Sequence, residues 1–213
     1  MYLPKDFKED SVPLMHEAIR GARLGTLVTM GTDGIEASHI PMLVDPEPAP
    51  FGTLKGHIAR GNPQWRGASG HVQALAIFLG PDAYITPAWY ETKRQSGKVV
   101  PTWNYVAIHA YGPLTFYEDA DRLLALVTQL TETHEAGRDQ PWAVSDAPKD
   151  FIAGMLKAIV GFELPIARLE GKWKMSQNRP AADRAGVVAG LRHEGGPEEV
   201  VVADIVAKAT RAP

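Results

Sequence analysis

Cysteine is absent from this sequence of 213 residues. Its absence excludes disulfide bonds, thiolate zinc sites, iron–sulfur clusters and cysteine nucleophiles. A chain without cysteine suits a reducing compartment, and the first ten residues lack the apolar run of a signal peptide. We therefore expect a cytoplasmic protein.

Several common enzyme motifs are missing as well. No two glycines are separated by a single residue, so the Rossmann fingerprint does not occur. The two Gly-Lys pairs, at 97–98 and 171–172, lack the earlier glycine of a P-loop. The chain contains neither a Gly-x-Ser-x-Gly elbow nor a His-Glu-x-x-His pair. No stretch approaches the roughly 20 apolar residues of a spanning helix, so we expect no membrane partner.

The chain also lacks an excess of positive charge. Lys and Arg number 22 against 25 Asp and Glu, which gives a formal net charge of −3. DNA-binding domains usually carry a clear basic excess. DNA is therefore a candidate partner only through a local patch, for which Lys93, Arg94 and Lys98 are available.

The pattern of apolar residues predicts a mainly β chain with flanking helices, an α+β fold. Asp33-Gly34 lies between two β-rich runs and predicts a hairpin. We expect strands up to residue 117, with turns at Gly80-Pro81 and Gly112-Pro113, and a helix capped by Asp119. Because strands and helices do not alternate, an antiparallel barrel is favoured. The expected domains are residues 1–178, a barrel with inserted helices, and residues 179–213, a helical extension.

The segment 53–63 is the first candidate site. A predicted strand ends near His57, Arg60 supplies a bidentate donor, and Asn62 precedes a proline that opens a helix. Backbone N–H groups at a helix start attract anions, so this segment is a candidate phosphate corner. The alternative is an ordinary surface turn with a solvated arginine.

A late basic strand is the second candidate site. Alternation places Lys174, Ser176 and Asn178 on one face, and Gln177 and Arg179 belong to the same segment. This face offers donors for a phosphate or for the polar edge of a flat cofactor. A solvated basic face is the alternative.

Two further segments carry polar groups beside strands. Trp103-Asn104 combines an aromatic ring with a recognition amide, although core packing is the usual role of such rings. Pro41 cannot donate to a β-ladder, so the stretch of Ser38, His39, Ile40 and Pro41 marks an edge or a strand end. His39 is also explained as a structural histidine.

Five motifs in order resemble the PaiB-type proteins, a family of FMN-binding negative transcriptional regulators. They are MYLPKDF, GHIARGNPQW, YITPAWYE, VPTWNYVAIHAYG and GKWKMSQNRP. The resemblance implies an FMN-binding split β-barrel that works as a homodimer with FMN at the interface. By position in the barrel it implies flavin contacts from Ser38–Pro41, from His57, Arg60 and Asn62, from Trp103-Asn104, and from Lys174, Ser176, Gln177 and Arg179.

The function stays open between three hypotheses. The resemblance favours a flavin-binding regulator of transcription in bacteria. The second hypothesis is an FMN-dependent oxidoreductase of a small molecule, including haem-related ones, because the superfamily resembles such enzymes. His39, His57 or Tyr105 of this chain are then candidates for proton transfer, and no catalytic residue is assigned. The third hypothesis is a dimer that binds no flavin.

Overall fold

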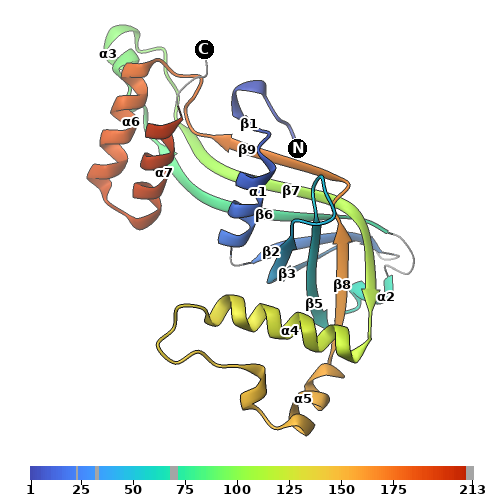
Figure 1. The fold of residues 1–213 in the computed structure, drawn as a ribbon. Helices are drawn as coiled ribbons and strands as arrows, with labels where there is room; N and C mark the ends of the chain where they lie inside the picture. The colour runs from blue at the N-terminus through green and yellow to red at the C-terminus, as the bar shows by residue number, and fades with distance from the viewer. Residues whose placement is uncertain (23, 32–33, 68–71, 210–213) are drawn as a thin grey trace. The chain divides into compact units, whose positions relative to one another are not determined.

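The structure is a computed structural model that describes residues 1–22, 24–31, 34–67 and 72–209 (Figure 1). The chain forms two compact units. One, which we call the α4 unit, consists of Val12–Phe78 and His109–Leu169. The other, the α6 unit, consists of Met1–Ser11, Leu79–Ile108 and Glu170–Pro213. Compactness does not test independent folding, so the predicted division at residues 178 and 179 stays a prediction.

Nine antiparallel strands dominate the described chain. Their order is β3-β2-β6-β7-β8-β5-β4, with β9 beside β7 and β1 beside β9. The long strands β6 and β7 each contribute residues to both units. The bounds are β1 Lys8–Glu9, β2 Gly25–Gly31, β3 Gly34–Ile40, β4 Met42–Asp45, β5 Thr53–Ala59, β6 Val72–Ile85, β7 Thr102–Tyr117, β8 Ile159–Pro165 and β9 Arg168–Lys174.

The β2–β3 hairpin confirms the prediction made from the turn signal. Gly31 pairs with Gly34 and Gly25 pairs with Ile40. Asp33, the first residue of that signal, lies outside the described residues. The register places Ser38, near the end of β3, opposite Leu27 of β2.

The two turns predicted inside β6 and β7 are wrong. Both strands continue through Gly80-Pro81 and Gly112-Pro113 without a break. A Cβ at Gly80 would overlap the Val106 side chain, and one at Gly112 would overlap the carbonyl oxygen of Pro165. These glycines therefore mark places where a neighbouring chain segment comes close, which is the other common role of glycine in a strand.

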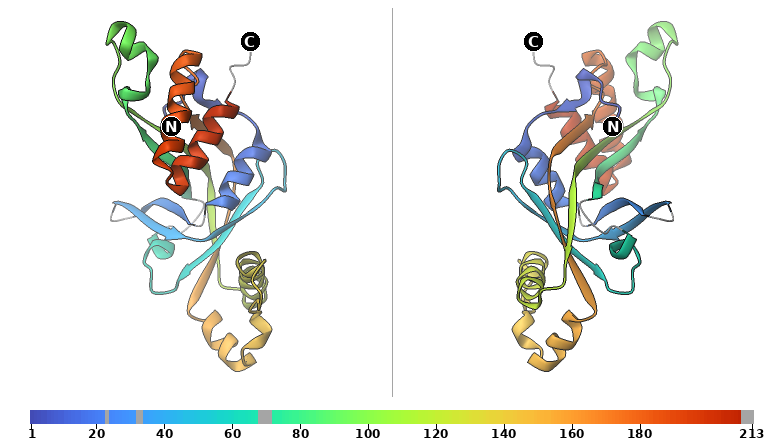
Figure 2. Two further views of the ribbon diagram at one scale, coloured as in Figure 1. Left: turned by 90° about the vertical axis from the view of Figure 1, so that its left-hand side faces the viewer. Right: turned by 90° about the vertical axis from the view of Figure 1, so that its right-hand side faces the viewer.

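Helices flank the strands, as predicted. In the α4 unit, α4 packs on β5 and β8 with α5 beside it, as Figures 1 and 2 show. In the α6 unit, α6 and α7 form an antiparallel pair. Their bounds are α1 Val12–Gly21, α2 Gln64–Gly67, α3 Glu91–Ser96, α4 Ala120–Glu135, α5 Lys149–Leu156, α6 Ala181–Glu194 and α7 Pro197–Lys208.

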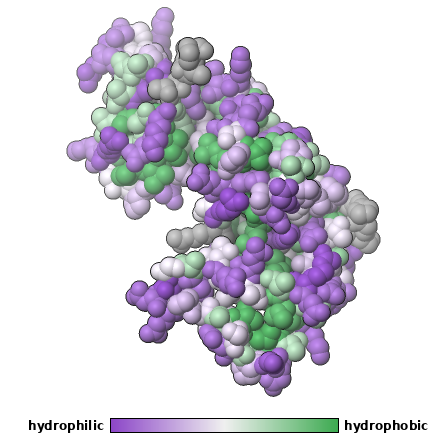
Figure 3. Space-filling view, viewed as in Figure 1, coloured by the Kyte–Doolittle hydropathy of each residue, from purple (hydrophilic) through white to green (hydrophobic). Residues whose placement is uncertain are grey.

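The start of α4 follows a local signal. The Asp119 carboxylate accepts a hydrogen bond from the Arg122 backbone N–H at 2.9 Å, which confirms the predicted cap. The buried face consists of Leu123, Leu126 and Leu130. Leu124, next to this face in sequence, is 39% exposed. With Phe151 and Met155 of α5, it belongs to the exposed hydrophobic side chains of this region (Figure 3).

Within the described ranges, none of the helices has both the length and the apolar character that crossing a membrane requires.

Candidate functional site

A hydrogen-bonded network joins the end of β3 to the junction of β5 and α2. The Asn62 amide donates to the Ser38 hydroxyl at 2.8 Å, and that hydroxyl donates to Gln64 Oε1 at 2.6 Å. Asn62 Oδ1 accepts from the Gln64 backbone N–H at 3.0 Å. The Gln64 amide donates to Leu27 O at 3.1 Å and to Thr29 Oγ1 at 3.0 Å. The network brings together two of the predicted residues, Ser38 and Asn62, in one corner.

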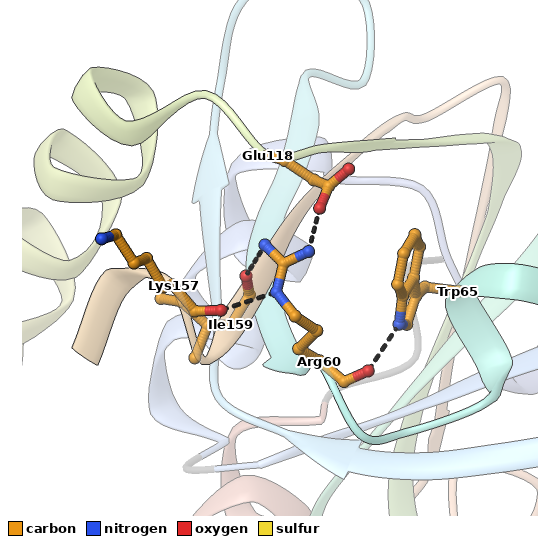
Figure 4. Close-up of polar contacts among 5 residues, drawn as sticks. All are labelled: Arg60, Trp65, Glu118, Lys157 and Ile159. Atoms are coloured by element: carbon orange, nitrogen blue, oxygen red, sulfur yellow. Dashed lines mark hydrogen bonds and ion pairs between the residues drawn. The ribbon is translucent and has the colours of Figure 1, made fainter. Parts of the chain in front are cut away.

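Arg60, at the same junction of β5 and α2, makes contacts of its own, as Figure 4 shows. Its Nε donates to Lys157 O at 2.6 Å and its Nη2 to Ile159 O at 3.3 Å, while its Nη1 is paired with the Glu118 carboxylate. Arg60 O in turn accepts from the Trp65 indole at 2.9 Å. Three of the five guanidinium N–H groups are thus bound to the protein itself. A phosphate contact by the other two stays a prediction.

His57 and Pro41 line one pocket of about 300 Å³ between the β4–β5 region and α4. His57 Nδ1 is buried and has no hydrogen-bond partner among the described residues. Burial lowers the pKa of His57 below its usual 6.5, because a charged imidazole loses its hydration there. The pocket therefore presents a neutral imidazole at neutral pH. Its other walls come from Val127, Leu130, Thr131, His134, Glu135 and Trp142.

The remaining two residues of the Ser38–Pro41 stretch point to different surroundings. The side chain of Ile40 is buried, with 6% of its surface exposed, and contributes to the core. His39 is exposed, and its Nδ1 lies 3.0 Å from Thr26 Oγ1 on the paired strand. His39 thus fits the structural alternative that the sequence left open.

In the α6 unit, the predicted late basic segment meets the start of β7. Lys174 Nζ donates to Thr102 Oγ1 at 2.5 Å and to the carbonyl oxygen of Trp103. The buried Asn104 amide donates to the Ser176 hydroxyl at 3.1 Å, and that hydroxyl lies 3.2 Å from Asn104 Oδ1. Ser176 adopts the left-handed φ of 62°, which non-glycine residues rarely adopt away from constrained sites.

These residues surround a pocket of about 100 Å³. Burial, followed by the charges of Lys172 and Arg179, lowers the pKa of Lys174 below its usual 10.5. An anion bound in the pocket would favour the charged form of Lys174 and so raise its pKa. The lining consists of Val100, Pro101, Thr102, Asn104, Lys174, Ser176, Asn178 and Arg179.

The other predicted residues of this unit have local partners. Gln177 folds back on its own turn: its Oε1 accepts from Met175 N at 2.7 Å and its amide donates to Trp173 O at 2.6 Å. The guanidinium of Arg179 lies 4.6 Å from the centre of the Tyr90 ring. Trp103 is 53% exposed and meets Tyr84 edge to face at 5.8 Å.

Sequence reasoning missed Gln64 and Thr102. Gln64 is 1% exposed and forms the centre of the first network, but its sequence context suggests only the first turn of a short helix. Thr102 becomes a partner of Lys174 only through contact between segments 72 residues apart. No local signal marks either residue.

The family model described as "Putative FMN-binding domain" matches residues 1–168. Among full-length relatives, an uncharacterised protein of Aspergillus fumigatus is 37% identical over 92% of this chain and 92% of its own length. The protease synthase and sporulation protein PAI 2 of Bacillus subtilis is 32% identical over 97% of this chain and 96% of its own.

A solved structure shares the fold at low sequence identity. The FAD and heme binding protein from Mycobacterium smegmatis superposes with a TM-score of 0.57 at 15% identity, over 78% of this chain and 73% of its own. The likeness confirms the architecture that the sequence predicted, a mainly antiparallel split barrel with flanking helices.

The first prediction concerns the carboxamide of Gln64. Gln64→Met should lower the free energy of unfolding by about 1–3 kcal/mol, because the Leu27 carbonyl and the Thr29 hydroxyl lose a buried donor. Urea unfolding measures the difference. Gln129→Met makes the same change on the exposed face of α4 and should stay within about 0.5 kcal/mol of the parent. Equal effects of the two changes would contradict the structural role of the network.

The second prediction follows from the lowered pKa of His57. Below about pH 6.5 the unfolded chain binds a proton that the folded protein does not, so stability falls as the pH falls through this range. The slope from one such group is at most about 1.4 kcal/mol per pH unit. His57→Gln should remove this part of the acid sensitivity in urea unfolding, whereas His39→Gln, at an exposed position, should leave it. Parallel pH curves for the parent and His57→Gln would show that burial does not perturb the imidazole.

Proposed function

We propose that the protein is a flavin-dependent oxidoreductase of a small molecule. The basis is that this chain belongs to the FMN-binding domain family and that FMN is its cofactor. Membership of the family confirms the resemblance to the PaiB-type proteins. The observation that carries the proposal is a pocket of about 300 Å³ with a mainly apolar lining that includes His57. Its imidazole is half-buried and neutral, and its Nδ1 has no hydrogen-bond partner among the described residues. Such a pocket has the size and lining of a small-molecule site.

The polar atoms of this chain suit FMN. A buried Nδ1 without a partner in the described structure, at His57, offers a hydrogen bond that a bound group completes. The donors around Lys174 suit an oxyanion. We place the flavin along Ser38–Pro41, His57 and Asn62 of the α4 unit. From the α6 unit of the second copy in a homodimer, we place contacts by Trp103, Asn104, Lys174, Ser176, Gln177 and Arg179.

Each residue set has its own part in this proposal. Bound FMN supplies reversible electron transfer, and the protein orients it and controls protons. His57, neutral at the working pH, is suited to hold or deliver a proton at its ring nitrogens. Gln64 and Arg60 keep the corner in shape: the first fixes Ser38 and Asn62, and the second fixes the end of β5.

The third prediction tests the oxidoreductase. The purified protein, loaded with FMN, should show a flavin absorbance that bleaches with a nicotinamide donor under anaerobic conditions and returns with an acceptor. His57→Gln should still bind FMN but turn over about 10²-fold more slowly, the usual effect of losing a general acid or base. A flavin that no donor reduces would count against the proposal, and a monomeric mass in solution would remove the dimeric part of it.

A second candidate function is regulation of transcription. One surface observation favours it: Lys93, Arg94 and Lys98 are all exposed on and after the short helix α3, which makes a local basic patch on a chain of net charge −3.

The fourth prediction tests that candidate by its salt dependence. If the patch binds DNA, affinity should fall steeply with salt, and a triple change of these residues to Gln should flatten the slope by about three phosphate contacts. Equal affinity for all sequences at every salt concentration would leave only unspecific binding and remove the regulator hypothesis.

A further inference from the structure

Three cations gather in the α6 unit without an anionic partner. Lys172, Lys174 and Arg179 have no carboxylate within ion-pair distance among the described residues. Lys172 is 7% exposed, donates to Tyr2 O at 3.1 Å, and lies over the rings of Tyr2 and Tyr105. Such a group of like charges is costly away from bulk water unless an opposite charge is supplied.

The carboxylates of the neighbouring elements have other partners. Glu170 at the start of this segment binds the N-terminal ammonium at 2.6 Å. Asp183 of α6 accepts from the Thr92 N–H at 2.8 Å and from its hydroxyl at 2.9 Å. Among the described residues, the protein therefore gives none of these three side chains a direct ion pair.

The pocket beside the cluster is built for an anion. Of the three N–H groups of Lys174, two are bound to Thr102 and Trp103, which fixes the ammonium in place and leaves one N–H available. The Thr102 hydroxyl and the second N–H of the Asn104 amide add neutral donors at the same wall. Ser176 keeps its strained φ of 62° there, and its backbone carbonyl accepts from Arg179 N at 3.0 Å, which fixes the turn that brings Arg179 to the pocket.

The charge and size of the pocket favour a small anion. Its volume of about 100 Å³ has room for one tetrahedral oxyanion. The positive side chains of Lys174 and Arg179 in its lining disfavour a cation. A doubly charged group compensates more of this charge than a carboxylate does.

We infer that the pocket of Thr102, Asn104, Lys174, Ser176 and Arg179 binds the phosphate group of a phosphate monoester. The inference deepens the proposed function, on which it rests where FMN is the monoester concerned. It also differs from the prediction that placed the phosphate at Arg60. There, three of the five guanidinium N–H groups already have protein acceptors, one of which is the Glu118 carboxylate.

The fifth prediction uses inorganic phosphate as the probe. Calorimetric titration of the full-length, flavin-free protein should show one phosphate site, and Lys174→Met should weaken it at least tenfold, because a charge-assisted hydrogen bond is lost while the apolar stem remains. Lys208→Met removes the same charge from an exposed position of the same unit, outside every site proposed here, and should leave the affinity unchanged. Near-UV circular dichroism confirms that each variant is folded.

A second variant keeps the test decisive if Lys174→Met is unstable. Arg179→Gln removes another cation of the pocket and should also weaken phosphate at least tenfold. Phosphate affinity that is unchanged in both folded variants, or that falls equally in Lys208→Met, would overturn the inference.

The source of the phosphate group is decided by comparing FMN with riboflavin. If the pocket holds the flavin's phosphate, the preference of the parent protein for FMN over riboflavin should fall at least tenfold in Lys174→Met. If the preference persists while inorganic phosphate binding is lost, the inference holds and the monoester is a different ligand. Failure of the parent to bind FMN at all would defeat the proposed function, and the phosphate titration would still report on the pocket.

Discussion

The buried carboxamide of Gln64 is the constraint on which the arrangement of the α4 unit depends. Its amide reaches Leu27 and Thr29 of β2, and its oxygen accepts from Ser38 of β3. A helix of only four residues, α2, cannot hold a position by its own backbone hydrogen bonds. The side chain does so instead, because a buried amide without its partners is costly. The corner between β3 and β5 therefore owes its shape to one residue that contacts no ligand in our proposal.

Local signals in the sequence predicted the parts of the fold that local interactions decide. Asp119 caps α4 through a residue three positions away, and the glycine after Asp33 begins the strand that pairs with β2. The turns predicted at Gly80 and Gly112 failed for the opposite reason. The sequence shows only a glycine, whether a turn or a close neighbouring segment requires it. The neighbours here, Val106 of Gly80 and Pro165 of Gly112, are distant in sequence. Sequence alone does not distinguish the two causes.

The candidate sites also depend on long-range contacts that the local sequence does not reveal. Strand alternation was predicted to bring Lys174, Ser176 and Asn178 to one face, but β9 ends at Lys174 and the other two residues lie in the turn that follows. All three line one pocket because of that turn. Arg60 has the spacing of a phosphate ligand, yet its acceptors are Glu118, Lys157 and Ile159, which lie 58 to 99 residues away. A positive side chain in a loop acts on a ligand or on the protein according to which acceptors the tertiary structure supplies. That information is absent from the segment that contains the arginine.

The net charge of the chain does not reveal the local positive charge that our inference depends on. The chain is acidic as a whole, at −3, but three cations converge beside a small pocket in the α6 unit. Lys172 is nearly buried, and Ser176 keeps a rarely adopted backbone angle in the same region. Both features lower the stability of the ligand-free protein. A bound anion would restore the lost stability, because the positive charge that destabilises the ligand-free protein is also the charge that attracts the anion. Destabilisation without a ligand and affinity for one are thus two measurements of the same electrostatic arrangement.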